Sequence, residues 1–139
     1  MNRQFEEFVF VCVERRTSFA IETTLRSAMT FEQARLAKSA GFTTEMRYLA
    51  LHDVSMCIER VKVRADAGGH SASEKTLRET YKLSIANLRR AIAEMDDLWV
   101  YDNSSVGGPP RLVLESEKGT VRFQADDPPD WLTRAVLLS

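Results

Sequence analysis

Two arginines one helical turn apart are the residues whose type and spacing most clearly indicate chemistry. Arg60 and Arg64 stand four positions apart, so a helix would place them on the same face. Neither has a carboxylate three or four positions away, and like charges at this spacing repel each other by about 0.3 kcal/mol. Because guanidinium groups match the geometry of phosphate, we expect an external anion between them. Two solvated arginines are the alternative interpretation.

A glycine-containing turn follows this pair. Gly68, Gly69 and His70 join two predicted helices, and the free amides at the start of a helix can hold an anion. An ordinary helix–helix turn is the alternative interpretation. Arg78 lies beyond the turn and has Glu74 four positions before it. This intrahelical partner favours a structural role for Arg78 on local grounds.

Polar residues also follow two short apolar segments. Glu22 ends residues 18–22, which we predict as a buried strand, and at such a position it can bind substrate or act as a general base. Asp102 and Asn103 follow a second predicted strand. They are either ligand-binding residues or turn-forming residues, since both types favour turns.

The cysteines and histidines indicate neither a metal site nor an oxidising compartment. Cys12 and Cys57 lie in apolar runs, and a buried, reduced thiol is the simplest interpretation of each. His52 and His70 lack metal-ligand spacing with either cysteine, so we expect no metal. No run reaches the roughly 18 uncharged apolar residues that a membrane span needs, and the first residues lack the pattern of a secretion signal. We expect a cytoplasmic protein without a membrane partner.

The composition limits the architecture and the class of ligand. The 139 residues fit one domain, and 44% hydrophobic with 28% charged residues are typical of a globular chain. The net charge of −1 gives no reason to expect a nucleic-acid partner. Residues 54–95 nevertheless hold eight basic and five acidic residues. A modestly basic middle favours a local anion site over a nucleic-acid track.

Hydrophobic periodicity and capping residues divide the chain into elements. Thr30 and Gln33 fit a capping box, Asp53 can cap the next helix, and Ser71 with Glu74 fits a second box. We predict a helix over residues 5–13, for which a strand is the alternative. Further helices are expected over 30–41, 54–67 and 71–95 and from residue 130, strands over 18–22, 42–52 and 98–101, and a β-hairpin formed by 111–114 and 121–125.

Strands that alternate with helices predict a parallel α/β sheet with flanking helices. In such sheets ligands bind beyond the carboxyl ends of the strands. We therefore expect Glu22, His52, Asp53, Asp102 and Asn103 to lie along one edge of the sheet.

Several motifs, taken in order, resemble the zeta-toxin family of P-loop kinases. S-F-A-I-E-T-T-L begins at Ser18, R-V-x-x-R at Arg60 and G-G-H at Gly68. Y-x-x-S-x-x-N-L and Y-D-N-S follow from Tyr81 and Tyr101. The resemblance covers residues 5–105, and the combination of motifs is specific although each one alone is weak. It fades in residues 106–139, which we expect to form the hairpin and a short terminal helix.

The resemblance implies an ATP-dependent phosphotransferase that uses ATP and Mg²⁺. The acceptor would be a nucleotide sugar such as UDP-N-acetylglucosamine, or another small hydroxyl compound, and an antitoxin protein is an implied partner. Glu22 would lie near the acceptor, and Arg60 and Arg64 would face the nucleotide phosphates. Gly69 and His70 would form a lid turn. Where the family has an arginine before a tyrosine this chain has Thr80, so Arg78 would have to substitute.

The motif with which a P-loop kinase holds phosphate is absent. It requires G-x-x-x-x-G-K-[ST], and none of the six glycines precedes a lysine. We therefore expect residues 1–139 to form a partial P-loop kinase-like domain that lacks the N-terminal P-loop βα unit and is inactive alone. A non-catalytic remnant that binds nucleotide or a partner protein is the alternative. Strands left without a neighbour would be exposed, so we also expect self-association or another chain there.

Overall fold

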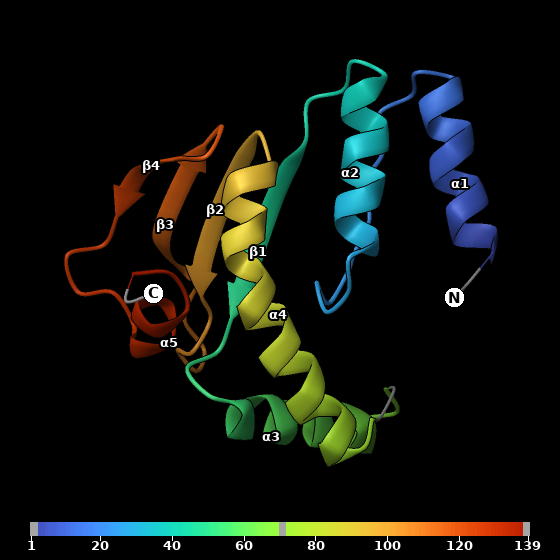
Figure 1. The fold of residues 1–139 in the computed structure, drawn as a ribbon. Helices are drawn as coiled ribbons and strands as arrows, with labels where there is room; N and C mark the ends of the chain where they lie inside the picture. The colour runs from blue at the N-terminus through green and yellow to red at the C-terminus, as the bar shows by residue number, and fades with distance from the viewer. Residues whose placement is uncertain (1–2, 70–71, 138–139) are drawn as a thin grey trace.

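The computed structural model describes residues 3–69 and 72–137. Two consecutive helices precede each of the first two strands, and a hairpin with a short helical segment completes the chain (Figure 1). The predicted hairpin is confirmed, and the strands expected over 42–52 and 98–101 form as β1 and β2. In chain order the elements are α1 (Arg3–Glu14), α2 (Met29–Ser39), β1 (Glu45–Ala50), α3 (Val54–Asp66), α4 (Glu74–Glu94), β2 (Asp97–Asp102), β3 (Arg111–Glu117), β4 (Thr120–Gln124), α5 (Asp130–Leu132) and a π-helical turn (Thr133–Leu137).

The strands form one mixed sheet in the order β1-β2-β3-β4. β1 pairs with β2 in parallel, whereas β3 and β4 are antiparallel to their neighbours. The prediction of a parallel α/β sheet is therefore wrong. The loop over residues 103–110 is too short to hold the crossover helix that a parallel connection needs, so β3 returns antiparallel to β2. The hairpin thus joins the sheet through β3.

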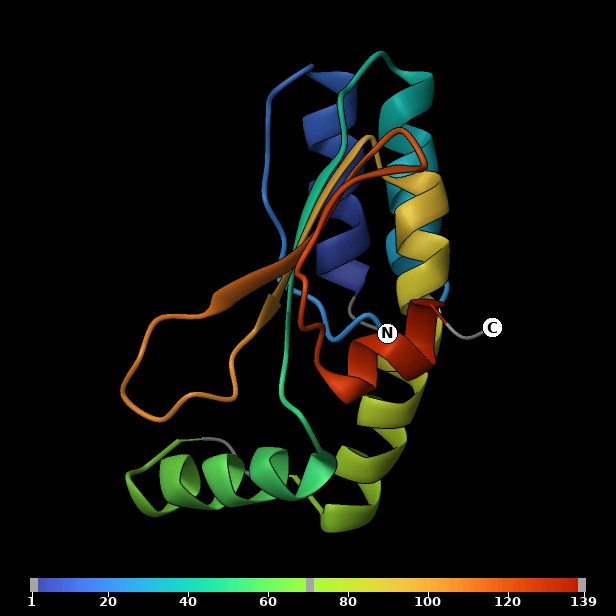
Figure 2. The ribbon, with the colours of Figure 1, turned by 90° about the vertical axis from the view of Figure 1, so that its left-hand side faces the viewer.

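Residues 18–22 belong to none of these strands, which is a second reason why the parallel sheet does not form. They carry no regular secondary structure, and Figure 2 shows the drawn-out segment that contains them descending from α1 toward α2. Phe19 and Ile21 pack against a small cluster of α1 and α2 residues, Val9, Val13 and Ala37. The apolar run is used for contacts with two helices and not for strand pairing.

The structure tests three predicted helix starts. Asp53 caps α3 as predicted, because its carboxylate accepts a backbone N–H three residues on at 3.0 Å. Ser73 does the same for α4 at 3.1 Å, whereas the predicted box begins at Ser71, which lies outside the described residues. The predicted cap at Thr30 is wrong: its hydroxyl hydrogen-bonds that of Thr23, and α2 already begins at the preceding residue.

The core lies between the sheet and α4, on the side of the sheet that also carries α5 (Figure 2). Leu88 and Ala91 of α4 and Leu98 and Val100 of β2 have no exposed surface. Helix α3 contributes a single buried residue, Ile58. The two helices that follow β1 are therefore packed to very different extents.

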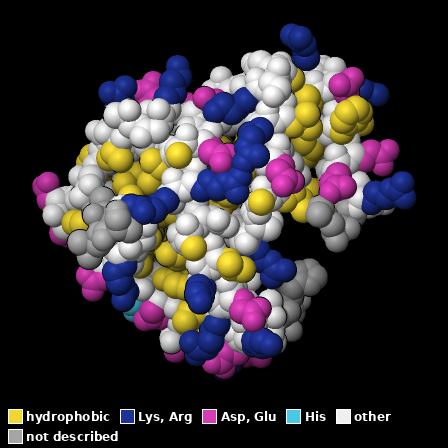
Figure 3. Space-filling model, viewed as in Figure 1, with side chains coloured by type: hydrophobic (Ala, Val, Ile, Leu, Met, Phe, Trp, Pro, Cys, Tyr) yellow, Lys and Arg dark blue, Asp and Glu magenta, His cyan; other side chains and the backbone are white. Residues whose placement is uncertain are grey.

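Basic and acidic side chains are interspersed over the face seen in Figure 3. One such group joins α2 to the C-terminal end of α4. The carboxylate of Glu94 accepts hydrogen bonds from Arg35 at 3.1 Å and Arg90 at 2.7 Å, and Lys38 lies 3.4 Å from Asp96. These contacts lie at the C-terminal end of α4. The N-terminal half of α4 packs against α3 instead.

Candidate anion-binding pocket

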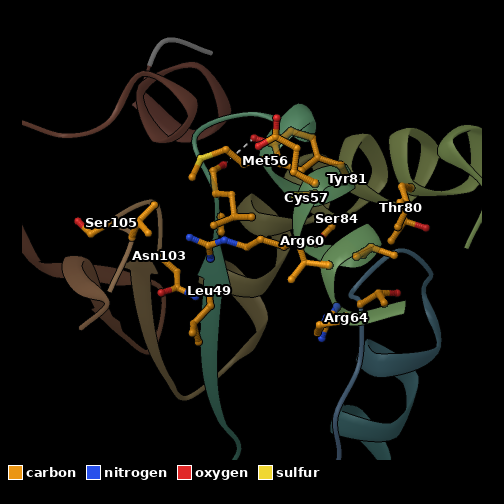
Figure 4. A pocket seen from close by; sticks show the side chains of 18 of the residues that line it. Leu49, Met56, Cys57, Arg60, Arg64, Thr80, Tyr81, Ser84, Asn103 and Ser105 are labelled. Atoms are coloured by element: carbon orange, nitrogen blue, oxygen red, sulfur yellow. Dashed lines mark hydrogen bonds between the residues drawn. The ribbon is translucent and has the colours of Figure 1, made fainter. Parts of the chain in front are cut away.

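A cavity of about 880 Å³ lies where the C-terminal end of β1 meets α3, α4 and the loop after β2. Figure 4 shows side chains from all four parts of the chain around it. Its volume lies within the roughly 300–1,000 Å³ that is usual for small-molecule sites. Much of the wall is apolar. Its polar and charged side chains are Thr24, Tyr48, Cys57, Glu59, Arg60, Arg64, Thr80, Tyr81, Ser84, Asn103 and Ser105.

Arg60 and Arg64 both line this cavity, as their shared helix face predicts. They are carried by α3, which the Asp53 cap starts directly after β1. Arg60 is half-buried and Arg64 is exposed. Figure 4 shows the Arg60 side chain reaching across the cavity toward Asn103, whereas Arg64 lies farther from the β2 loop. The two guanidiniums therefore serve different parts of one cavity.

Neither guanidinium makes an ion pair or a hydrogen bond with any residue that the structure describes. Other arginines of the chain do have carboxylate partners: Arg78 lies 2.7 Å from Glu74, and Arg111 lies 2.8 Å from Asp127. Two positive charges that share a cavity and have no carboxylate partner among the described residues make the cavity a candidate site for an anion, although the carboxylate of Glu59 also belongs to its wall.

The turn after α3 does not offer its first amides to a ligand. The backbone N–H of Gly69 donates to the carbonyl of Arg64 at 2.7 Å, and a β-carbon at Gly69 would lie only 2.8 Å from that oxygen. Gly68 has φ of +92°, which glycine adopts without strain. Glycine is thus needed to end the helix, which favours the helix–helix turn as the interpretation of Gly69, and a ligand role for this turn stays a prediction. His70 lies outside the described residues.

Arg78 and Glu22 do not line the cavity. Arg78 is held by Glu74, its predicted intrahelical partner, at 2.7 Å. Glu22 is exposed in the irregular segment, while Thr24, two positions on, is part of the wall. The expectation that Glu22 lies along the sheet edge with the other polar residues is wrong, because the strand that would have placed it there does not form.

Asp102 and Asn103, at the end of β2, have different roles. The carboxylate of Asp102 accepts hydrogen bonds from the hydroxyl and the backbone N–H of Ser104, and it does not line the cavity. Asn103 does line it, and its backbone N–H donates to the Ala50 carbonyl at 2.8 Å. The Ser104 hydroxyl accepts the backbone N–H of His52 at 2.8 Å. These two hydrogen bonds join the C-terminal ends of β1 and β2, so His52 and Asn103 lie at one edge of the sheet, as predicted, and Asn103 is held in position.

The N-terminal half of α4 supplies a wall that the sequence reasoning missed. Thr80, Tyr81 and Ser84 face the cavity. Ser84 lies four positions after Thr80 and three after Tyr81, and this helical spacing is the signal that could have found them. The Tyr81 hydroxyl donates to the Leu51 carbonyl at 2.9 Å, and burial raises the pKa of Tyr81 to about 12. Tyr48 hydrogen-bonds Ser84 at 2.9 Å. These phenols remain neutral and brace the wall.

Cys57 contributes a thiol to the same cavity. Burial raises its pKa, and the negative charge of Asp53 raises it further, while Arg60 acts in the opposite direction. The thiol therefore stays protonated near neutral pH, which disfavours a nucleophilic role. Its prediction as a buried, reduced packing residue is close to the half-buried, free thiol found here.

The residues present fit phosphate better than they fit a metal. Guanidinium, hydroxyl and amide groups are the donors that phosphate oxygens accept, and Arg60, Arg64, Thr80, Ser84 and Asn103 supply them. Within residues 3–69 and 72–137, no group of three or more His, Cys, Asp or Glu side chains is arranged to hold a metal ion. The implied Mg²⁺ would therefore lack a cluster of three such protein ligands among these residues.

Comparison with known proteins provides one match. An uncharacterized protein from Haemophilus influenzae is 26% identical to this chain over 69 residues, which is 50% of this chain and 49% of that protein. The match thus spans about half the length of each protein. No protein-family model matches the chain, and no solved structure matches it. In the described part of the chain, no helix is long and apolar enough to cross a membrane.

Proposed function

We propose that the pocket binds the phosphate groups of a nucleotide or nucleotide sugar through Arg60 and Arg64. One observation carries the proposal: both guanidiniums line a single cavity, and neither is bonded to any described residue. A ligand with more than one negatively charged group can place charge near both guanidiniums, which offsets their mutual repulsion. The anion would also recover hydrogen bonds that the guanidiniums otherwise make only to water.

The cavity favours a ligand larger than an inorganic ion. A phosphate group would occupy a small part of about 880 Å³, and the remaining wall includes the apolar side chains of Leu49, Met56 and Val106. Asn103 lies where it can donate to a polar group of the same ligand. An organic phosphate with a planar or ring-shaped remainder uses both kinds of wall.

The activity that we propose for this chain is binding without phosphoryl transfer. The resemblance to zeta-toxin kinases supports a phosphorylated ligand and suggests ATP or UDP-N-acetylglucosamine as probes. Transfer would require the transition-state charge to be stabilised by a set of preorganised donors, and removing even one such donor costs about 10²–10³ in rate. Without a glycine-lysine phosphate loop, we expect negligible phosphorylation of UDP-N-acetylglucosamine by this chain. ATP-dependent turnover that requires Arg64 would contradict this proposal.

We further propose that binding takes place in the cytoplasm, because both cysteines are free and nucleotides are the expected ligands. An antitoxin protein, which the family resemblance suggests, is the corresponding candidate partner.

Titration calorimetry with ADP and with UDP-N-acetylglucosamine tests the proposed site. Replacing Arg64 or Arg60 with glutamine removes a charged hydrogen bond, so each variant should bind about 10- to 100-fold more weakly. Arg78→Gln is the matched control, because Arg78 lies on the adjacent helix and is paired with Glu74 outside the cavity. Its affinity should stay within about threefold of the unaltered chain.

Two results would reject the proposal. One is that neither ligand binds the folded chain, and the other is that Arg60→Gln and Arg64→Gln bind as tightly as Arg78→Gln. Adenosine, which lacks phosphate, provides the second control and should show no effect of either arginine.

A further inference from the structure

Three exposed apolar side chains border the cavity from three different parts of the chain. Leu49 of β1, Val63 of α3 and Val106 of the loop after β2 all line it, and 52%, 68% and 91% of their surfaces are exposed. Single exposed apolar residues are common, but several around one hollow indicate a binding site. Figure 2 shows the orange loop over residues 103–110 and α3 projecting from the same face of the sheet, with the loop above the helix. Val63 and Val106 therefore belong to different walls of the cavity.

The loop after β2 is held at both of its ends. At its start the backbone N–H of Asn103 donates to the Ala50 carbonyl at 2.8 Å. At its end the guanidinium of Arg111 lies 2.8 Å from the Asp127 carboxylate. Between these two points, no group within residues 105–108 hydrogen-bonds any described residue. The middle of the loop can therefore move without breaking a hydrogen bond of the described fold.

We propose that residues 105–108 form a lid that closes toward α3 over the ligand, so that Val106 covers the ligand's apolar part. The proposal rests on the proposed function, because Arg60 and Arg64 hold the phosphate end of that ligand. The cavity of about 880 Å³ lies near the upper end of the range for small-molecule sites, which leaves room for the lid to move inward. Closure takes exposed surface of Val106 and Val63 out of water, and the hydrophobic effect favours this.

The charge of Arg60 makes closure depend on the ligand. Its side chain reaches across the cavity toward Asn103, at the base of the loop (Figure 4). A lid closed over Arg60 alone would remove a positive charge from water without compensation, which is costly. A phosphate beside the guanidinium supplies that compensation, and their attraction strengthens as water is excluded. Bound ligand therefore shifts the loop toward the closed position.

An NMR experiment with ADP locates the lid directly in the unaltered chain. When the chain is saturated with ADP, we expect nuclear Overhauser effects between the Val106 methyl groups and the ring protons of adenine. The backbone amides of residues 106–108 should also exchange more slowly with water. Saturation with ADP that produces neither effect would overturn the proposal.

Variants at exposed valines measure how much the lid contributes to affinity. Val106→Ser should bind ADP about tenfold more weakly, because the ligand's apolar part loses its cover. Val106→Leu keeps an apolar side chain and should stay within about threefold of the unaltered chain. Val121→Ser is the matched control, because Val121 is exposed on β4 and lies outside the cavity. Its affinity should also stay within about threefold.

The same titrations separate the lid from the anion site beneath it. If Val106→Ser and Val121→Ser bind ADP equally well while Arg60→Gln binds it weakly, the lid is wrong and the proposed function stands. If the unaltered chain does not bind ADP, both proposals are wrong.

Discussion

Helices α3 and α4 follow one another in the chain but differ in how much apolar surface they bury. α4 presses Leu88 and Ala91 into the sheet with no exposed surface, whereas α3 buries only Ile58 and leaves Val63 68% exposed. The arginines of the candidate site lie on the lightly packed helix. The contrast indicates that stability is concentrated between α4 and the sheet, and that α3 presents charge to a ligand on this support.

The largest expected effect comes from removing core volume beneath α4. Leu88→Ala should lower the free energy of unfolding by about 3 kcal/mol, because a fully buried leucine leaves a cavity. Urea denaturation followed by circular dichroism measures this loss. Ile58→Ala, at the single buried position of α3, should cost about 2 kcal/mol or less. Equal losses at the two sites would break the proposed contrast between the helices.

The double variant Arg60→Gln with Arg64→Gln should separate ligand binding from stability. Its free energy of unfolding without ligand should lie within about 0.5 kcal/mol of the unaltered chain, since neither arginine has a partner to lose among the described residues. Thermal unfolding with ADP added should then show no ligand-induced rise in Tm, although the unaltered chain shows one. A double variant that is markedly unstable without ligand would mean that the arginines serve the fold.

Removing the cap of α3 should act locally. Asp53→Ala removes the acceptor for a backbone N–H at the first turn and should cost about 1 kcal/mol. Amide hydrogen exchange should quicken in α3, where few contacts oppose opening, and remain unchanged in the buried part of α4. Exchange that quickens equally in both helices would show that they unfold as one unit.

The smallest expected effect is on the pH dependence of stability, through Asp96, which directly precedes β2. A backbone hydrogen bond from Thr44, 2.8 Å long, holds the pKa of Asp96 below its ordinary value. Stability from this carboxylate is present above its unfolded pKa, and it is lost as pH falls through the lower folded pKa. Denaturation midpoints between about pH 5 and pH 2 should therefore fall less steeply in Asp96→Asn. Parallel curves for both proteins would contradict this role.

The sequence was sufficient where a local physical rule decides the outcome. The Asp53 cap, the hairpin and the shared face of Arg60 and Arg64 all follow from spacing within a few residues. Residues 18–22 show the limit, because an apolar run does not say whether its contacts will be strands or helices. The same limit applies to sheet direction and to the cavity wall on α4, which depend on partners far away in the sequence.

Binding of phosphate by Arg60 and Arg64 is tested by the side-chain Nε–H signals of arginine in an NMR titration with ADP. We expect the signals of Arg60 and Arg64 to shift together and to saturate at the same ligand concentration, while the signal of Arg78, paired with Glu74, stays in place. Shifts of equal size at all three arginines, or none at Arg60 and Arg64, would contradict it.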